Sequence, residues 1–235
     1  INPKKHKGQD VREVIDKCGF DSMNLKENWR GLYDIHKEAD DIMAEQIQLY
    51  SQLGKEVIVI SEDKDMFQIL SWEGNIRLFN LKEEITSEQV IEKLQIYPEQ
   101  YVDMKCLMGD SSDNIPGLVG VGEANAKKLL QEFGSINFIP NSRYLIYVPK
   151  DSKNISLKLK EYREKNNLSL AACMKEYGSY WKPYENEKPT PPQNGLILER
   201  LFEDLKIRHL FEVKNYKEEI FLWKKLMKLP LVINP

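Results

Sequence analysis

The sequence has few cysteines, no long apolar run and almost no net charge. Its three cysteines, Cys18, Cys106 and Cys173, are odd in number and form no CxxC pair, which argues against a disulfide framework and a zinc ribbon. We therefore expect reduced, mostly packed thiols. No apolar run approaches the about 18 residues that a membrane span requires, and the opening INPKKHKGQD does not resemble a signal peptide. The expected setting is the cytoplasm.

The formal net charge of −3 gives the whole chain no electrostatic preference for nucleic acid. Basic patches at residues 4–7, 127–128 and 224–228 are typical of solvated surface as well as of phosphate contacts. Core-forming residues are plentiful, because 41% of the 235 residues are apolar and 10% are aromatic. That is enough for one large domain or two small ones.

The first half of the chain alternates helical and strand-like segments. Helical spacing of apolar residues predicts helices over residues 10–19 and 39–53, the second ending before Gly54. The stretch EVIVIS is apolar without alternation at residues 57–60, which is typical of a parallel strand buried on both faces. Residues 76–81, IRLFNL, are a second strand candidate.

Two further helices follow in the sequence. Thr86 and Gln89 form a capping box for a helix over residues 86–95. Pro98, at a first helical turn, opens another helix that extends through Met108. Helices that alternate with strands in this order predict an α/β unit with a parallel sheet.

The second half has weaker patterns. A helix is predicted to end at Gly134, residues 135–195 show little periodicity, and the prolines of residues 183–195 indicate a loop or linker. LILERLFEDL, residues 196–205, predicts a helix, and EIFLW, residues 219–223, predicts a strand.

Acidic residues gather where the predicted elements begin or end. Seven carboxylates fall into three short clusters: Glu38, Asp40 and Asp41; Asp63 and Asp65; Asp110 and Asp113. One such cluster alone is most often a helix cap with favourable dipole charges. Three clusters that met at one sheet edge would repel one another unless cations lay between them. Oxygen ligands without His or Cys indicate Mg²⁺ or Mn²⁺, and two such ions support phosphodiester hydrolysis.

The glycines of PGLVGVGEANAKKLL suggest a second kind of site. Gly117, Gly120 and Gly122 run G-x-x-G-x-G after a polar loop, which is not the dinucleotide-binding fingerprint. A glycine hairpin before a helix N-terminus instead offers backbone N–H groups to phosphate, with Lys127 and Lys128 close behind. A plain helix-loop-helix turn is the alternative interpretation.

Together the stretches KEADD, VISEDKDMFQIL and MGDSSDNIPGLVGVGEANAKKLLQEFGSI closely resemble the 5′ nuclease family. This family comprises the N-terminal exonuclease domain of bacterial DNA polymerase I, phage 5′-3′ exonucleases and flap endonucleases. The dense match covers residues 37 to about 138. ERLFEDLKIRHLF and KEEIFLW fit the family's closing segments loosely.

The resemblance implies roles for these residues. Glu38, Asp40 and Asp41 would serve a first Mg²⁺ (or Mn²⁺), and Asp63, Asp65, Asp110 and Asp113 a second. The hairpin over residues 117–122 would be a helix-three-turn-helix element that binds duplex DNA, in the family often with K⁺ held by its carbonyls. NPKKHKGQD matches the family's arch motif only loosely, with Lys7 at the lysine position and Asp10 where arginine is expected.

The resemblance also implies the fold and the partners. We expect an α/β, PIN-like parallel sheet flanked by helices with an inserted helix-three-turn-helix subdomain. One 5′ nuclease domain over residues 1–235 would consist of an α/β metal-binding part (1–108), a helical DNA-binding part (109–182), a Pro-rich loop (183–195) and a return to the α/β part (196–235). Family members carry further Asp residues on an N-terminal strand and after the next strand, and this sequence shows neither. Three alternatives stay open: an N-terminal segment precedes this sequence, that segment is a separate polypeptide, or the protein is degenerate. A DNA polymerase and such an N-terminal segment are the expected protein partners.

The predicted activity is that of a Mg²⁺-dependent 5′-3′ exonuclease or flap endonuclease. Its substrates would be 5′ ends, flaps or RNA primers on duplex DNA in a bacterial cell or a phage-infected host. Trp29, Tyr33 and His36 could stack on bases, although aromatic residues at helical spacing more often belong to a core. Two alternatives stay open, a non-catalytic DNA-binding remnant and a PIN-type metal-dependent RNase.

Overall fold

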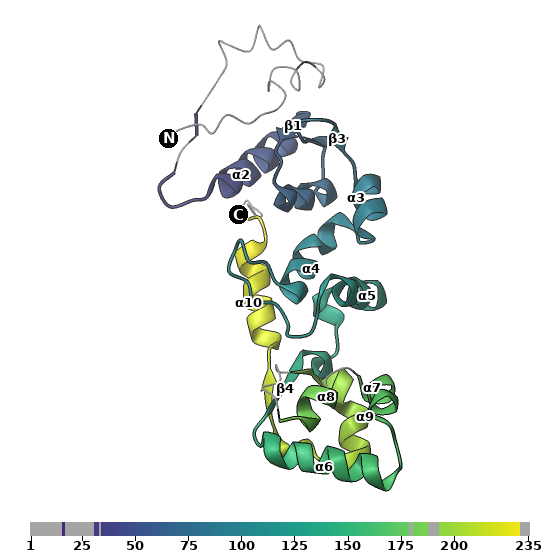
Figure 1. The fold of residues 1–235 in the computed structure, drawn as a ribbon. Helices are drawn as coiled ribbons and strands as arrows, with labels where there is room; N and C mark the ends of the chain where they lie inside the picture. The colour runs from purple at the N-terminus through teal and green to yellow at the C-terminus, as the bar shows by residue number, and fades with distance from the viewer. Residues whose placement is uncertain (1–15, 17–30, 33, 179–180, 188–192, 231–235) are drawn as a thin grey trace. The chain divides into compact units, whose positions relative to one another are not determined.

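The computed structural model describes residues 16, 31–32, 34–178, 181–187 and 193–230 (Figure 1). The described residues up to Val102, together with those from Met227 onward, form a first compact unit, and Asp103–Leu226 form a second. Both units combine helices with small sheets, so the α/β class is confirmed. The helix predicted over residues 10–19 lies outside the described residues, apart from Asp16.

The first unit begins with a helix and continues with short strands and helical turns. Its elements are α2 (Ala39–Gln52), β1 (Val57–Ile60), the 3₁₀ helix η2 (Lys64–Ser71), β2 (Ile76–Phe79), β3 (Glu84–Ile85), α3 (Ser87–Leu94), η3 (Pro98–Gln100) and the start of α4 (Tyr101–Met108). The helix starts predicted at the acidic cluster, at Thr86 and at Pro98 are confirmed. The reciprocal capping box of Thr86 and Gln89 is present, with the Thr86 side chain accepting the Gln89 N–H.

The sheet of the first unit has the order β1-β2-β3. β1 and β2 are parallel, in the register Val57↔Ile76, which confirms the predicted parallel pairing. The second strand is shorter than predicted, because Asn80 begins a turn in which its Oδ1 accepts the Lys82 N–H at 2.7 Å. That turn returns the chain antiparallel as β3.

The prediction that β1 is buried on both faces is wrong for the described part of the chain. Val59 is buried, whereas Ile58 and Ile60 are only half-buried. A groove of about 640 Å³ lies between β1 and α2, and Ile58 and Ile60 contribute to its lining. The apolar run therefore reflects one packed face and one apolar groove wall.

The last described residues return to the first unit and are held there by two glutamines. Gln48 Nε2 donates to the Pro230 carbonyl at 2.6 Å. The buried Gln68 donates to the Met227 carbonyl and accepts the Leu229 N–H, both at 3.1 Å. Leu229 completes the core by packing with Ala44, Ile47, Val59, Met66, Ile69 and Leu78.

The second unit contains most of the helices. After α4 it comprises α5 (Glu123–Phe133), η4 (Ile136–Phe138), η5 (Asn141–Tyr144), β4 (Leu145–Pro149), α6 (Ser152–Lys165), α7 (Leu170–Tyr177), α8 (Trp181–Glu185), β5 (Gln193–Asn194), α9 (Gly195–Leu205), η6 (Arg208–Leu210), β6 (Phe211–Asn215) and α10 (Lys217–Met227). Its sheet has the order β5-β4-β6 with antiparallel pairing. The fully buried Trp181 lies in a core rich in aromatic side chains.

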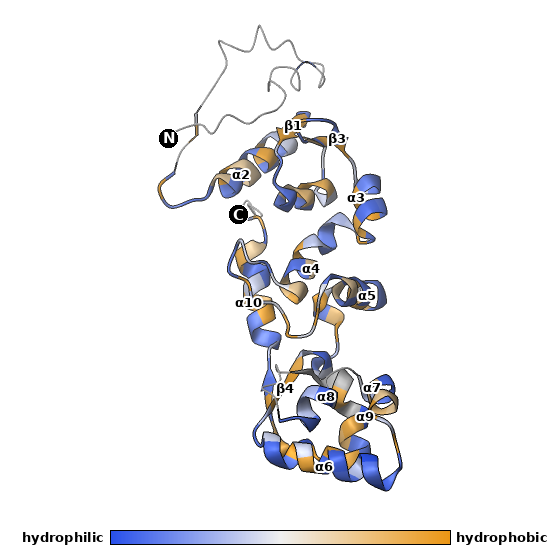
Figure 2. Ribbon diagram, in the orientation of Figure 1, coloured by the Kyte–Doolittle hydropathy of each residue, from blue (hydrophilic) through white to orange (hydrophobic). Residues whose placement is uncertain are grey.

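The strand predicted at EIFLW is wrong, because these residues lie inside α10. Glu218 and Glu219 occupy the first turn of this helix and Lys224 and Lys225 the last, so the charges complement its dipole at both ends. Figure 2 shows apolar and hydrophilic residues interspersed along α10, as in an amphipathic helix. The helix predicted over residues 196–205 is confirmed as α9.

A buried carboxylate ties three elements of the second unit together. Asp103, on α4, is only 2% exposed. Its Oδ1 lies 2.7 Å from Lys224 Nζ, and its Oδ2 accepts from Ser135 Oγ at 2.8 Å and from the Ile136 N–H at 3.0 Å. Because every one of these bonds compensates a buried charge, the network fixes α10 and η4 on α4.

Two of the cysteines, Cys106 and Cys173, are buried and free, as predicted, and Cys18 lies outside the described residues. Burial raises the pKa of the Cys106 thiol to about 12, so it stays protonated and unreactive at neutral pH.

Within the described ranges, the helices are all too short or too polar to cross a membrane.

Candidate metal-binding carboxylates and glycine hairpin

The first acidic cluster lies at the N-terminus of α2. Glu38 is the N-cap residue, and its backbone N–H donates to Asp41 Oδ2 at 3.4 Å. Asp40 and Asp41 both lie in the first turn, where the helix dipole favours negative charge. Helix capping therefore accounts for Glu38 and Asp41 but does not account for Asp40.

The second cluster follows β1 directly. Asp63 is the N-cap residue of η2, and its Oδ1 accepts the Asp65 N–H at 2.9 Å. The Asp63 N–H in turn donates to Ser61 Oγ at 3.1 Å. Both carboxylates thus lie just past the carboxyl end of a parallel strand, where open α/β sheets place their ligands.

These two clusters converge within the first unit. The pKa of Asp40 is raised by its partial burial and then by the charges of Asp63, Asp65, Glu38 and Asp41. These charges come from acidic residues of both clusters. A positive ion bound in this neighbourhood would therefore reduce the repulsion among them.

The carboxylates do not form a closed cage. Within the described part of the chain, no three His, Cys, Asp or Glu side chains are close enough together to hold a metal ion. Mg²⁺, however, keeps several of its waters and commonly binds proteins through one or two carboxylates together with substrate phosphates. The oxygen-only donors and the mutual repulsion of the carboxylates around Asp40 fit such an ion.

We expect Asp40→Asn to stabilise the metal-free protein at pH 7 by on the order of 0.5 kcal/mol, the scale of one partly exposed charge interaction. Since the pKa of Asp40 is raised on folding, the folded protein holds this proton more tightly than the unfolded chain. The ionised carboxylate therefore destabilises the fold increasingly as the pH rises from the unfolded pKa through the folded one.

Urea unfolding of the parent and the variant at several pH values checks this prediction. The two stabilities should converge in acid and separate toward neutral pH, with Asp40→Asn the more stable chain. Glu62→Gln, which removes an exposed charge next to Asp63 that does not contribute to the raised pKa of Asp40, is the control and should change little. A variant that is less stable than the parent at pH 7 would contradict the proposed repulsion.

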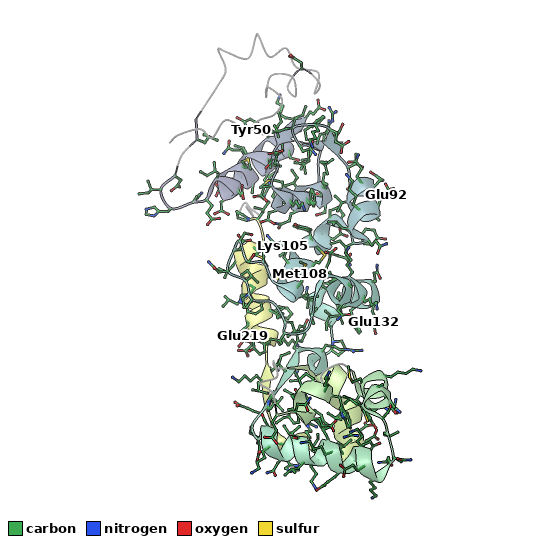
Figure 3. All side chains as sticks on the ribbon, in the orientation of Figure 1. Tyr50, Glu92, Lys105, Met108, Glu132 and Glu219 are labelled. Carbon is green, nitrogen blue, oxygen red and sulfur yellow. The ribbon has the colours of Figure 1, made fainter. Side chains whose placement is uncertain are left out.

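The third cluster belongs to the second unit and has its own counter-charge. Lys105 Nζ lies 2.6 Å from Asp110 Oδ2 and 3.0 Å from Asp113 Oδ2. Figure 3 labels Lys105 on α4. The Lys105 ammonium and the Ser112 hydroxyl and N–H hold the pKa of Asp110 at about 2, so this carboxylate is ionised at all ordinary pH values.

Sequence reasoning missed Lys105. The only signal was a basic residue within the otherwise apolar stretch MKCLM, five positions before Asp110. A lysine that is almost fully buried needs an anionic partner, so the stretch contained a hint that a carboxylate packs against it.

The glycines after α4 differ in what they do. Gly117 has φ +70°, and a Cβ there would lie 2.3 Å from the Gly109 nitrogen. Gly120 also has a positive φ of 81°. Gly122 has open space around it and is the N-cap residue of α5. Packing within the fold therefore requires glycine at position 117, because the backbones of Gly117 and Gly109 touch there. At Gly122 the fold leaves space that is accessible to a ligand.

The two lysines predicted to contact phosphate are also not equivalent. Lys127 pairs with Glu123 at 2.6 Å and is half-buried. Lys128 is exposed. Lys128 is therefore the better placed of the two for an external anion. Its role, like those of all the predicted site residues, stays a prediction.

Three other predicted contacts cannot be placed. Lys7, Trp29 and Tyr33 lie outside the described residues. His36 is described and exposed, and its backbone N–H donates to Asp34 Oδ1 at 2.8 Å.

Comparisons with known proteins agree on a similarity to 5′-3′ exonucleases and DNA polymerase I. Residues 96–186 match the family described as "5'-3' exonuclease, C-terminal SAM fold". The 5′-3′ exonuclease of Buchnera aphidicola subsp. Schizaphis graminum is 38% identical over 165 residues, which are 68% of this chain and 54% of that protein. DNA polymerase I of Bacillus subtilis is 39% identical over 170 residues, which are 70% of this chain and 18% of that protein. This chain thus spans about half the length of the exonuclease and less of the polymerase.

Solved structures show a weaker likeness. The phage T5 5′-exonuclease, whose structure carries bound zinc, matches with a TM-score of 0.44 and 18% identity, covering 94% of this chain and 72% of that one. The catalytic core of Rad2 in complex with DNA matches with a TM-score of 0.32 and 18% identity, covering 95% and 72% of the two chains.

Proposed function

We propose that this chain is a Mg²⁺-dependent 5′ nuclease of the exonuclease or flap endonuclease type. It is similar to 5′-3′ exonucleases, and its residues 96–186 match the model of their C-terminal SAM fold. The observation that carries this proposal is Asp40, whose pKa is raised by its partial burial and by the carboxylates of two clusters, at the start of α2 and after β1. Carboxylates this close destabilise the fold when no cation is bound, and together they attract a divalent cation.

We assign the metal-binding role to the predicted carboxylates. Glu38, Asp40 and Asp41 at the start of α2, and Asp63 and Asp65 after β1, would bind divalent ions through oxygen. Asp110 and Asp113 are assigned to the same reaction by resemblance alone. When bound, a pair of divalent ions supplies a hydroxide at neutral pH and stabilises the attacking and leaving oxygens of a phosphodiester. Two ions, Mg²⁺ or Mn²⁺, are part of the proposal.

The chain's own residues would supply the remaining functions. Asp63 keeps Asp65 in place through its N-cap bond, so the second pair is positioned before any ion arrives. The open N-terminus of α5, at Gly122, with the exposed Lys128, would grip a phosphate of the duplex backbone without reading bases. We interpret α4, the glycine loop and α5 as the helix-three-turn-helix element, with K⁺ as a candidate ligand of its carbonyls, and the first unit as PIN-like.

The proposed substrate is DNA with a 5′ end, a flap or an RNA primer. A DNA polymerase is a candidate partner, because this chain is similar to a segment of DNA polymerase I from Lactococcus lactis and from Bacillus subtilis. An additional N-terminal segment is the other candidate, and it would add carboxylates to the first ion's ligands.

The test is a cleavage assay on a 5′-labelled flap duplex. A single-stranded RNA of the same length is the comparison substrate, and a reaction with a metal chelator is the control for metal dependence. Mg²⁺-dependent cutting of the flap near its junction, with the RNA left intact, is the expected result. Binding to the duplex without cutting, in the presence of the N-terminal segment of a related exonuclease, would support a non-catalytic DNA-binding module instead. Preferred cutting of the RNA would indicate a PIN-type RNase.

A further inference from the structure

The loop that carries Asp110 and Asp113 is closed on itself by short bonds. The Asp110 N–H donates to the Ile115 carbonyl and the Ile115 N–H to the Asp110 carbonyl, both at 2.8 Å. This pair makes a tight polar loop directly after α4. The loop therefore presents its two carboxylates in a defined place even when no ion is bound.

Both carboxylate oxygens of Asp110 are already engaged. Its Oδ1 accepts the Ser112 N–H at 2.8 Å and also the Ser112 hydroxyl. Its Oδ2 faces Lys105 Nζ at 2.6 Å, and the same ammonium also donates to Asp113 Oδ2 at 3.0 Å. Lys105 thus contacts one oxygen of each carboxylate, Asp110 Oδ2 and Asp113 Oδ2.

Lys105 is committed to this position. Its side chain is only 8% exposed, whereas that of Asp113 is 42% exposed. Its neighbours on α4, Cys106 and Leu107, are completely buried. Since a buried ammonium is costly unless it is paired, the two carboxylates stabilise Lys105 in this position.

From these contacts we infer that Lys105 is a built-in counter-ion that competes with a divalent metal for Asp110 and Asp113. This inference rests on the proposed metal-dependent function and makes it more specific. A divalent ion that takes Asp110 Oδ2 or Asp113 Oδ2 must displace the Lys105 ammonium from that oxygen. Lys105 thereby weakens divalent-ion binding by the second unit and keeps the loop neutralised until an ion arrives.

A rival interpretation predicts the opposite effect. If Lys105 only holds the loop in a shape that suits the ion, its removal would loosen the loop and weaken metal binding. If Lys105 competes, its removal would free two oxygens and strengthen metal binding. The sign of the change in affinity therefore decides between the two.

The experiment measures Mn²⁺ binding by electron paramagnetic resonance in the full chain carrying Asp63→Asn and Asp65→Asn, so that the loop carboxylates dominate. Lys105→Met removes the ammonium and keeps most of the side-chain length, and Lys105→Arg keeps the charge. We expect the Met variant to bind Mn²⁺ about tenfold more tightly, equivalent to about 1.4 kcal/mol, and the Arg variant to bind as the parent does. Adding Asp110→Asn and Asp113→Asn to the Met variant should abolish the gain. Equal or weaker binding by the Met variant overturns the inference.

A second measurement needs no substitution at Lys105 and guards against a Met variant that does not fold. ¹⁵N NMR of the lysine side-chain ammonium groups follows Lys105 during a Mg²⁺ titration of the wild-type chain. We expect its signal to be protected from solvent exchange at first and to lose that protection as the ion binds. A protected signal that persists at saturating Mg²⁺ overturns the inference.

These outcomes are separable from those of the cleavage assay. If the wild-type chain cuts the flap but Lys105→Met binds Mn²⁺ no more tightly than the parent, the proposed nuclease function stands and the proposed competition is wrong. If Lys105→Met binds Mn²⁺ more tightly but the wild-type chain cuts no substrate, the competition stands and the nuclease function is wrong.

Discussion

The Asp63→Asn, Asp65→Asn double variant should lose at least about 10³-fold of its metal-dependent cleavage, because a metal on the reacting phosphate contributes several kcal/mol to transition-state stabilisation. Its affinity for duplex DNA should stay close to that of the parent or increase, since the proposed grip on the backbone lies at the glycine hairpin. Asparagine caps helices as well as aspartate does, so the N-cap bond of Asp63 in η2 is preserved and the variant should fold normally.

Single-turnover cleavage of a 5′ flap, together with fluorescence-anisotropy binding to the same duplex in Ca²⁺ or without metal, measures both quantities. Glu62→Gln with Glu73→Gln is the matched control, because it removes two exposed carboxylates from the same unit without touching the predicted site. Full cleavage by the Asp63, Asp65 variant would disprove the assignment of these residues to a metal.

Alanine at Gly117 and at Gly122 should have contrasting effects. At Gly117 the added Cβ would overlap the backbone of Gly109 and force a non-glycine residue into a left-handed conformation. These two strains together should cost roughly 3 kcal/mol or more. At Gly122 the Cβ meets open space, and we expect a cost below about 1 kcal/mol, from the poorer N-cap alone.

Duplex binding should then distinguish the two sites. Gly122→Ala should fold and bind all duplex sequences several-fold more weakly, because a Cβ hinders the approach of phosphate to the α5 N-terminus. The Leu118 amide donates to the Leu107 carbonyl at 2.8 Å across the loop. Faster hydrogen exchange of this amide should show that the loop is disrupted in Gly117→Ala. Unchanged exchange at Leu118 in that variant, or unchanged DNA affinity in Gly122→Ala, would count against this division of roles.

Local signals explain which parts of the fold were predictable. The start of α2, the capping box at Thr86 and the parallel pairing of β1 with β2 each follow from a few neighbouring residues, and each was predicted correctly. The segment EIFLW was misjudged because its apolar residues were considered without the acidic and basic residues that flank them in α10. The sheet of β4 with β6 was missed because its strands are separated by α6, α7, α8 and α9, and no local pattern encodes that pairing.

The candidate site was predictable to a similar degree. Asp63 and Asp65 follow a parallel strand, so a general rule placed them at a ligand-binding edge, and the raised pKa of Asp40 supports their meeting with the first cluster. Lys105 was not predictable in the same way. Its partners are set by how the loop after α4 folds back, and the sequence gives only a charge inside an apolar helix.

The return of residues 227–230 to Gln48 and Gln68 has a consequence for how the protein is made. These hydrogen bonds join residues about 160 to 180 positions apart, and Leu229 belongs to the core of the first unit. A ribosome releases Gln48 and Gln68 long before it releases Leu229, whereas the second unit is contiguous in the sequence. At about 5–20 residues per second, the first unit must wait roughly ten seconds or more with an unfinished core. The second unit can therefore fold first, although its sequence starts later.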